Sequence, residues 1–105
     1  MRIAIATAAL IIAALPAHAM SGAELLQQTR SFGEGYVLGV VEVRTGVLDK
    51  DDPKFMQIRT CVLNAHVASD TLYEATVEWL RRNPKDLTFP AFGAVYKLLD
   101  EMCGA

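Results

Sequence analysis

Two cysteines, Cys61 and Cys103, are the residues in this 105-residue chain whose chemistry is easiest to interpret. They allow a single intramolecular pairing, and a disulfide is the default expectation in an oxidising compartment. A bond that closes a loop of roughly 40 residues stabilises a domain by about 4 kcal/mol in the chain-entropy picture. A pair of free thiols or an intermolecular bond are the alternatives.

The other reactive residue types do not form a recognisable catalytic or metal-binding pattern. His66 could act as a base for Cys61, but a cysteine with a disulfide partner is more often structural. Two cysteines and one histidine also lack zinc-ligand spacing. Glu34 and Glu42 could share a helix face, but two carboxylates alone do not define an acid–base site. We therefore expect no enzyme activity, no catalytic residue, and no cofactor or metal.

The N-terminal segment has the pattern of an export signal. Arg2 precedes an apolar run over residues 3–15, and Ala17-His18-Ala19 provides a small-x-small cleavage site. The sequence thus predicts a signal peptide over residues 1–19, a mature domain over residues 20–105 and a periplasmic location. An uncleaved membrane anchor is the alternative, although the run is short for a span of about 20 apolar residues.

The charge of the predicted mature chain excludes some classes of partner. Removing Arg2 leaves nine Lys and Arg residues against twelve Asp and Glu residues. A nucleic-acid-binding protein needs clustered positive charge, which this balance does not supply. Binding to an anionic membrane surface is disfavoured for the same reason.

Helical patterns dominate the first half of the mature chain. Ser21 and Glu24 have the spacing of a capping box, which predicts a helix from residue 22 to about 30. Residues 31–48 carry a helical apolar stripe, with a strand over 37–43 as the competitor. The stripe consists of Phe32, Tyr36, Gly39 or Val40, Val43 and Val47. Gly35 and Gly39 share one face, where they would either admit another backbone or simply weaken the helix.

The middle of the chain contains a polar break followed by an ambiguous segment. Asp49, Asp51 and Asp52 lie together in the break, but they lack the ligand spacing of a calcium loop, and so we expect a solvated turn. Residues 54–68 show a partial helical pattern, and we expect at least the second half to be irregular.

Two further helices are predicted in the second half. One begins near the cap candidates at residues 69–71, packs Trp79 into the core and ends at Asn83-Pro84. The other starts at Pro90. Its predicted buried stripe is Phe92, Val95, Leu98, Leu99 and Met102. The predicted fold class is therefore all-α, a small bundle of four to five short helices stapled by one disulfide.

The order of these elements resembles the Rap/Tai family of immunity proteins. The resemblance begins with Ser-Gly-Ala-Glu-Leu-Leu at 21–26 and Phe-Gly-Glu-Gly-Tyr-Val-Leu-Gly-Val at 32–40. It continues with Cys61, with Trp-Leu-Arg-Arg-Asn-Pro at 79–84 and with Leu-Asp-Glu-Met-Cys at 99–103. Family members often carry an earlier cysteine pair, near Gln28 or Thr29 and at Gly33, and this chain lacks both cysteines.

The resemblance implies a periplasmic protein, commonly a homodimer, that binds and inhibits a peptidoglycan amidase delivered by type VI secretion. Two polar turns are the candidate partner surface: Asp49, Asp51 and Asp52 in one, and Arg81, Arg82, Lys85 and Asp86 in the other. The main alternative is an acid-stress chaperone of the HdeA-like kind. Another exported binding protein, such as a small-ligand carrier, is the third possibility.

Overall fold

The computed structural model describes residues 19–46 and 51–105, and in these ranges the chain is all-α. The helices are α2 (Gly22–Gln27), α3 (Arg30–Gly46), α4 (Pro53–Ala65), α5 (Ser69–Arg82) and α6 (Ala91–Cys103), with a 3₁₀ helix, η1 (Pro84–Thr88), before α6. The predicted fold class is confirmed. Nearly all of the predicted signal peptide lies outside the described residues.

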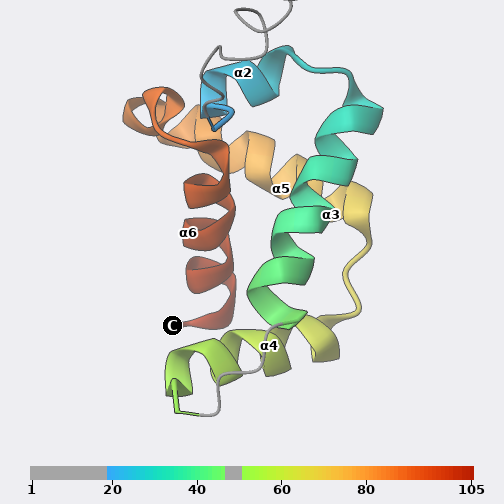
Figure 1. The fold of residues 1–105 in the computed structure, drawn as a ribbon, viewed down its shortest axis with the longest axis vertical. Helices are drawn as coiled ribbons and strands as arrows, with labels where there is room; N and C mark the ends of the chain where they lie inside the picture. The colour runs from blue at the N-terminus through green and yellow to red at the C-terminus, as the bar shows by residue number, and fades with distance from the viewer. Residues whose placement is uncertain (1–18, 47–50) are drawn as a thin grey trace, which may run out of the picture.

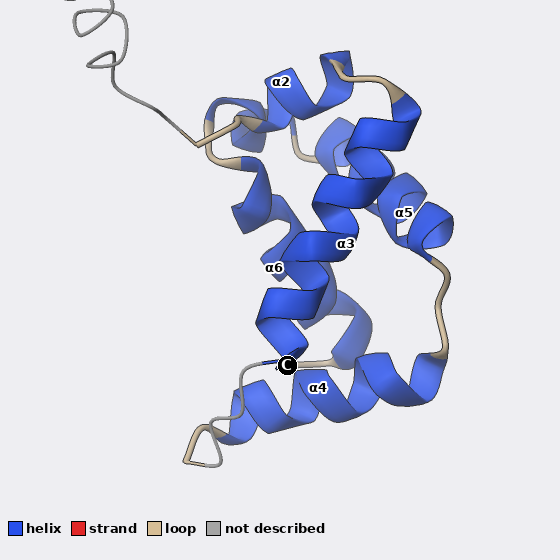
Figure 2. Ribbon diagram, turned by 45° about the vertical axis from the view of Figure 1, so that its right-hand side comes forward, coloured by secondary structure: helices blue, strands red, loops and turns tan. Residues whose placement is uncertain are grey.

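The helices form a frame around one core. Helices α3 and α6 run side by side, with α2 across one end, α4 across the other and α5 behind them (Figure 1). The turned view shows helices, loops and turns and no strand in the described part of the chain (Figure 2). In the described part of the chain, no helix is both long enough and apolar enough to cross a membrane. The largest fully buried side chains come from every α-helix: Leu25, Val37, Ile58, Thr76, Leu80, Val95 and Leu99.

The predicted capping box is confirmed at the start of α2. The backbone N–H of Glu24 donates to Ser21 Oγ at 3.1 Å, and the N–H of Ser21 donates to Glu24 Oε1 at 3.2 Å. The helix ends at Gln27, earlier than predicted, because Gln28 adopts an extended conformation. Thr29 Oγ1 then accepts from the N–H of Phe32 at 3.3 Å, which helps to begin α3.

The segment after Thr29 is a helix, not a strand, but the face it buries differs from the predicted stripe. The buried residues of α3 are Gly33, Val37, Val41 and Thr45. Phe32 and Val43, which were predicted to lie in the core, are exposed. The difference arises because α5 packs against α3 at Gly33, where the Tyr73 ring fills the space that a side chain would occupy.

Helix α4 overturns the prediction that the second half of residues 54–68 is irregular. Pro53 occupies the first turn, and Asp52 Oδ1 accepts from the N–H groups of Lys54 and Phe55 at 3.0 and 3.2 Å. This capping starts a helix that continues to Ala65 and ends at His66, whose φ is 49°. Tertiary packing at the buried Ile58 accounts for a helix that the local pattern left ambiguous.

The last helices follow the prediction in extent but not wholly in burial. Helix α5 ends at Arg82 before Pro84, as predicted, but Ala68 is its N-cap and no side chain caps it. In α6, Val95, Leu98 and Leu99 are buried, whereas Phe92 and Met102 are exposed. The predicted burial of Phe92 and Met102 is wrong, because the buried face of α6 passes through Ala91 and Ala94 instead of Phe92 and ends at Leu99.

Candidate functional site

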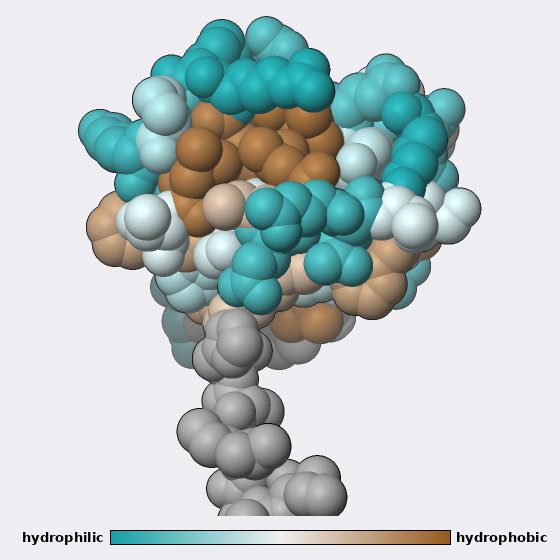
Figure 3. Space-filling model, turned by 90° about the horizontal axis from the view of Figure 1, so that it is seen from above, coloured by the Kyte–Doolittle hydropathy of each residue, from teal (hydrophilic) through white to brown (hydrophobic). Residues whose placement is uncertain are grey.

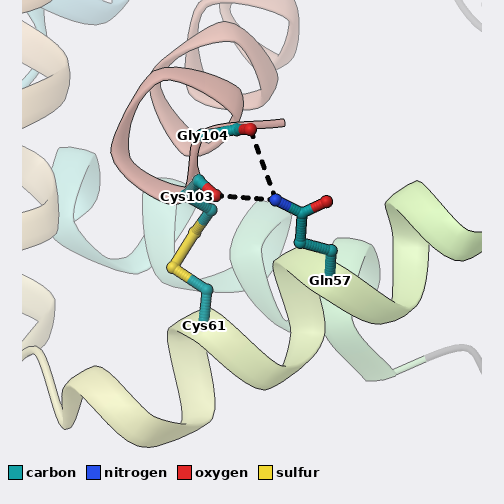
Figure 4. The surroundings of a disulfide bond; sticks show 4 residues. All are labelled: Gln57, Cys61, Cys103 and Gly104. Carbon is teal, nitrogen blue, oxygen red and sulfur yellow. Dashed lines mark hydrogen bonds between the residues drawn. A yellow bond between two sulfur atoms is a disulfide. The ribbon is translucent and has the colours of Figure 1, made fainter.

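The predicted disulfide joins α4 to α6. The Sγ atoms of Cys61 and Cys103 are 2.08 Å apart, and the two Cα atoms are separated by 5.8 Å. The amide of Gln57 donates to the carbonyl oxygens of Cys103 and Gly104 at 3.0 and 3.3 Å, which adds a second tie at the same point (Figure 4). Because Cys61 is bonded, it cannot act as the nucleophile that His66 would activate. His66 itself is an exposed residue at the end of α4.

The acidic turn, the first candidate partner surface, has a structural role at one of its residues. Asp52 caps α4, as described above, and its carboxylate is therefore already engaged by backbone N–H groups. Asp51 is exposed beside it. Asp49 lies outside the described residues.

The second candidate turn divides into exposed and buried parts. Arg81, Arg82 and Lys85 are exposed, and Arg82 Nη1 lies 3.7 Å from Glu101 Oε1. Asp86 differs from the expected solvated residue, because it is only 4 % exposed. Its Oδ2 lies 2.9 Å from Lys97 Nζ, and so Asp86 holds η1 against α6 rather than facing a partner.

Trp79 takes part in the same network and is buried, as predicted. Its Nε1–H donates to Glu101 Oε2 at 3.0 Å, and Lys97 Nζ lies 5.8 Å from the centre of its ring.

A second charged cluster joins α3 to α5, where the Arg30 guanidinium contacts Glu34 at 2.8 Å and Glu74 at 2.6 Å. The Glu74 hydrogen bond, with the nearby negative charge, raises the pKa of Arg30 above its ordinary value. Both networks join helices and thus stabilise the fold.

The sequence patterns did not predict an open apolar groove between α3 and α6. Its volume is about 520 Å³. The lining residues are Gly35, Tyr36, Gly39, Val40, Val43, Phe92 and Tyr96. The Phe92 and Tyr96 rings meet edge to face, with centres 6.0 Å apart. Val43 is 62 % exposed and Phe92 is 44 % exposed. The sequence contains the pair of glycines and the apolar stripe, but the helical pattern predicts that the stripe lies in the core.

A second hollow of about 450 Å³ continues the groove towards α4. It shares Val43 and Tyr96 with the groove and adds Arg44, Lys54, Phe55 and Asp100. The Arg44 guanidinium lies 4.9 Å from the centre of the Phe55 ring and 5.6 Å from that of Tyr96. Lys54 Nζ pairs with Asp100 Oδ2 at 3.0 Å. Within residues 19–46 and 51–105, no carboxylate forms an ion pair with Arg44.

The groove provides surface for binding and one perturbed titratable group. Partial burial raises the pKa of the Tyr36 hydroxyl above its ordinary value, and a hydrogen bond with the backbone of Phe92 partly opposes that shift. Across the described residues, no three His, Cys, Asp or Glu side chains are grouped so that they could hold a metal ion. An apolar groove with a cationic end can recognise apolar and negatively charged groups.

A further apolar area lies at the end of the molecule where α2 crosses. Seen from above, apolar residues gather there inside a ring of hydrophilic ones (Figure 3). Half-buried apolar residues of the elements that meet at this end include Leu26 in α2 and Leu87 in η1.

Comparisons of this chain with protein-family models, with curated proteins and with solved structures found no match.

Proposed function

We propose that this chain is a periplasmic immunity-type protein that binds and inhibits a peptidoglycan amidase delivered by type VI secretion. The observation that carries the proposal is the exposed apolar groove on a helical scaffold tied by the Cys61–Cys103 disulfide. Contiguous exposed apolar surface on a small domain marks an interaction site. The resemblance of residues 21–26, 32–40 and 79–84 to the Rap/Tai family gives the class of partner.

Inhibition of this kind requires shape and a few anchoring side chains, not a reaction centre. Aromatic and arginine side chains are the usual anchors of a protein interface. The groove contains both kinds, in Phe92, Tyr96 and the adjoining Arg44. The scaffold holds them in fixed relative positions because α3, α4 and α6 contact one another directly. The resemblance also implies a homodimer, which sedimentation of the purified protein measures.

The test pairs the full chain with candidate amidases, beginning with one encoded beside its gene. Bacteria that export the amidase to the periplasm should lyse without this protein and survive when it is co-expressed with its N-terminal segment. The purified protein should also block release of peptidoglycan fragments in a turbidity assay at near-stoichiometric ratio. Absence of both protection and binding for such an amidase would contradict the proposal.

A periplasmic acid-stress chaperone is the alternative function. The observation in its favour is that ion pairs join several helices, including Lys54–Asp100 and Lys97–Asp86. Acid in general weakens ion pairs between helices, and this would let apolar surface open. A chaperone should suppress aggregation of a client protein at pH 2–3 and lose this activity at pH 7. An immunity protein should bind its amidase at pH 7 and give no protection in acid.

A further inference from the structure

The groove exposes the backbone of α3 at two consecutive turns. A Cβ atom added at Gly35 or at Gly39 would meet no atom within 4 Å, whereas one added at Gly33 would lie 2.3 Å from the Tyr73 ring. Gly35 and Gly39 therefore face open space, and they leave the helix surface flat. Another chain can approach the α3 backbone closely at this point, since no side chain stands in the way.

Large apolar side chains border this flat strip along α6 and continue it along α3. Phe92 and Tyr96 border it on α6, and Val43 follows it on α3. Phe32, one turn before Gly35 on α3, is 53 % exposed. The strip and the α6 side chains beside it thus form an open apolar channel, and a chain that lies in it would remove these side chains from water at about 25 cal/mol per Å² of apolar surface.

One end of the channel is positively charged. The described residues that line the adjoining hollow include two cations, Arg44 and Lys54, and one carboxylate, Asp100. Asp100 is paired with Lys54, and the Arg44 guanidinium is held over the Phe55 and Tyr96 rings. Stacking on a ring uses the face of a guanidinium and leaves its N–H groups at the edge, where they can bind a carboxylate in two-point fashion.

We propose that the α3–α6 groove is the partner-binding site and that it takes an apolar helical segment that carries a carboxylate at one end. The apolar side chains of that segment lie over Gly35, Gly39 and Val43, and its carboxylate binds Arg44. The inference rests on the proposed function in so far as the partner is the amidase. It places the contact in the groove instead of the two polar turns.

The open form of the groove favours a protein segment over a small ligand. Sites for small molecules enclose most of the surface of the ligand, whereas an amphipathic helix binds by laying one face into an open apolar groove. The two hollows share Val43 and Tyr96, and so a segment can follow both without a break.

Three single variants test the site against the amidase by titration calorimetry. Arg44→Gln removes the cation, and Gly39→Leu fills the flat strip; each should weaken binding at least tenfold. Arg81→Gln, on the rival polar turn, is the matched control and should bind within twofold of the wild type. Circular dichroism and thermal melting verify that each variant keeps the fold. If the amidase binds wild type and Gly39→Leu equally, the groove is not the site, although the proposed function stands.

A second measurement needs no amidase. Dodecanoate below its micelle concentration has the proposed chemistry, and dodecyltrimethylammonium is the control with the opposite charge. Dodecanoate should shift the amide resonances of Gly35, Gly39 and Val43, and Arg44→Gln should remove most of this response. Equal responses to both amphiphiles, or none at these residues, would overturn the proposal. A response to dodecanoate without amidase binding would preserve the groove and reject the proposed function.

A second copy of this chain is the rival occupant of the groove. Sedimentation velocity of wild type and Gly39→Leu at the same concentration separates the two cases. We expect the substitution to leave the sedimentation coefficient unchanged. If it converts a dimer into a monomer, the groove is filled by another copy and the proposal of a partner segment is wrong.

Discussion

The two faces of α3 carry residues of the same kinds in opposite surroundings. One face buries Gly33, Val37 and Val41 against the rest of the domain. The other presents Gly39 and Val43 to an open groove, with Val43 62 % exposed. Composition along the helix therefore does not tell which apolar face folds inward. Whether an apolar residue in this helix supports folding or binding depends on the neighbour that packs on it.

Gly33 and Gly39 also differ in what packs against them, although both lie in α3. Gly33 is required by the close approach of the Tyr73 ring, whereas Gly39 has no neighbour within 4 Å of an added Cβ. Gly39 lowers the helical preference of α3 and contributes nothing to its packing. A residue that weakens its helix without a packing reason is a candidate for function, and this agrees with its place in the proposed binding groove.

The largest expected effect on stability comes from removing the disulfide, which links α4 to α6. The double variant Cys61→Ser, Cys103→Ser should lose about 4 kcal/mol of unfolding free energy, since the unfolded chain gains the freedom of a long loop. Urea unfolding by circular dichroism measures the loss. A reduced and alkylated wild-type sample is the control and should fall with the variant. A change under about 1 kcal/mol would show that the bond is not a major stabilising contact.

A matched pair of valine variants tests the two faces directly. Val37→Ala removes two fully buried methyl groups and should cost about 2 kcal/mol, which corresponds to a drop in Tm of roughly 10 °C for a domain of this size. Val43→Ala makes the same change on the groove face and should alter the free energy by less than about 0.5 kcal/mol. Differential scanning calorimetry compares them. Equal losses would mean that both faces are buried in solution.

A pair of glycine variants should move stability in opposite directions. Gly33→Ala places a methyl group against the Tyr73 ring and should destabilise the fold by about 1–3 kcal/mol. Gly39→Ala adds a methyl group in open space and should stabilise the helix by about 0.5–1 kcal/mol through its better helical preference. Urea midpoints at constant m-value give both numbers. A stabilising Gly33→Ala would mean that α3 and α5 do not meet as described.

The smallest expected effect is a loss of stability at alkaline pH that comes from Tyr36, a residue that lines the groove. Burial raises the pKa of Tyr36 in the folded state, so the unfolded chain releases this proton first as the pH increases. The resulting loss of stability begins above the ordinary tyrosine pKa of about 10 and grows until the folded pKa is passed. Tyr36→Phe should lose less stability than wild type between pH 9 and 11. Parallel pH curves for the two proteins would contradict burial of this hydroxyl.

Local rules predicted most of the helices. The capping box at Ser21, the break at Pro84 and the helical period after Thr29 depend on neighbours within one turn, and all are present. The candidate site was less predictable. The charge of the two polar turns predicts a partner surface, but Asp52 caps α4 and Asp86 is buried beside Lys97.

Helix capping, apolar period and cysteine count are local or compositional properties, and so they are enough to predict the all-α class and the only pairing that two cysteines allow within one chain. Packing between helices is needed to know which stripe of α3 is buried and that α4 continues to Ala65. Packing also places Arg44 of α3 against the rings of Phe55 in α4 and Tyr96 in α6. The physical reason is that burial depends on the packed partner, and packing depends on residues far apart in the chain.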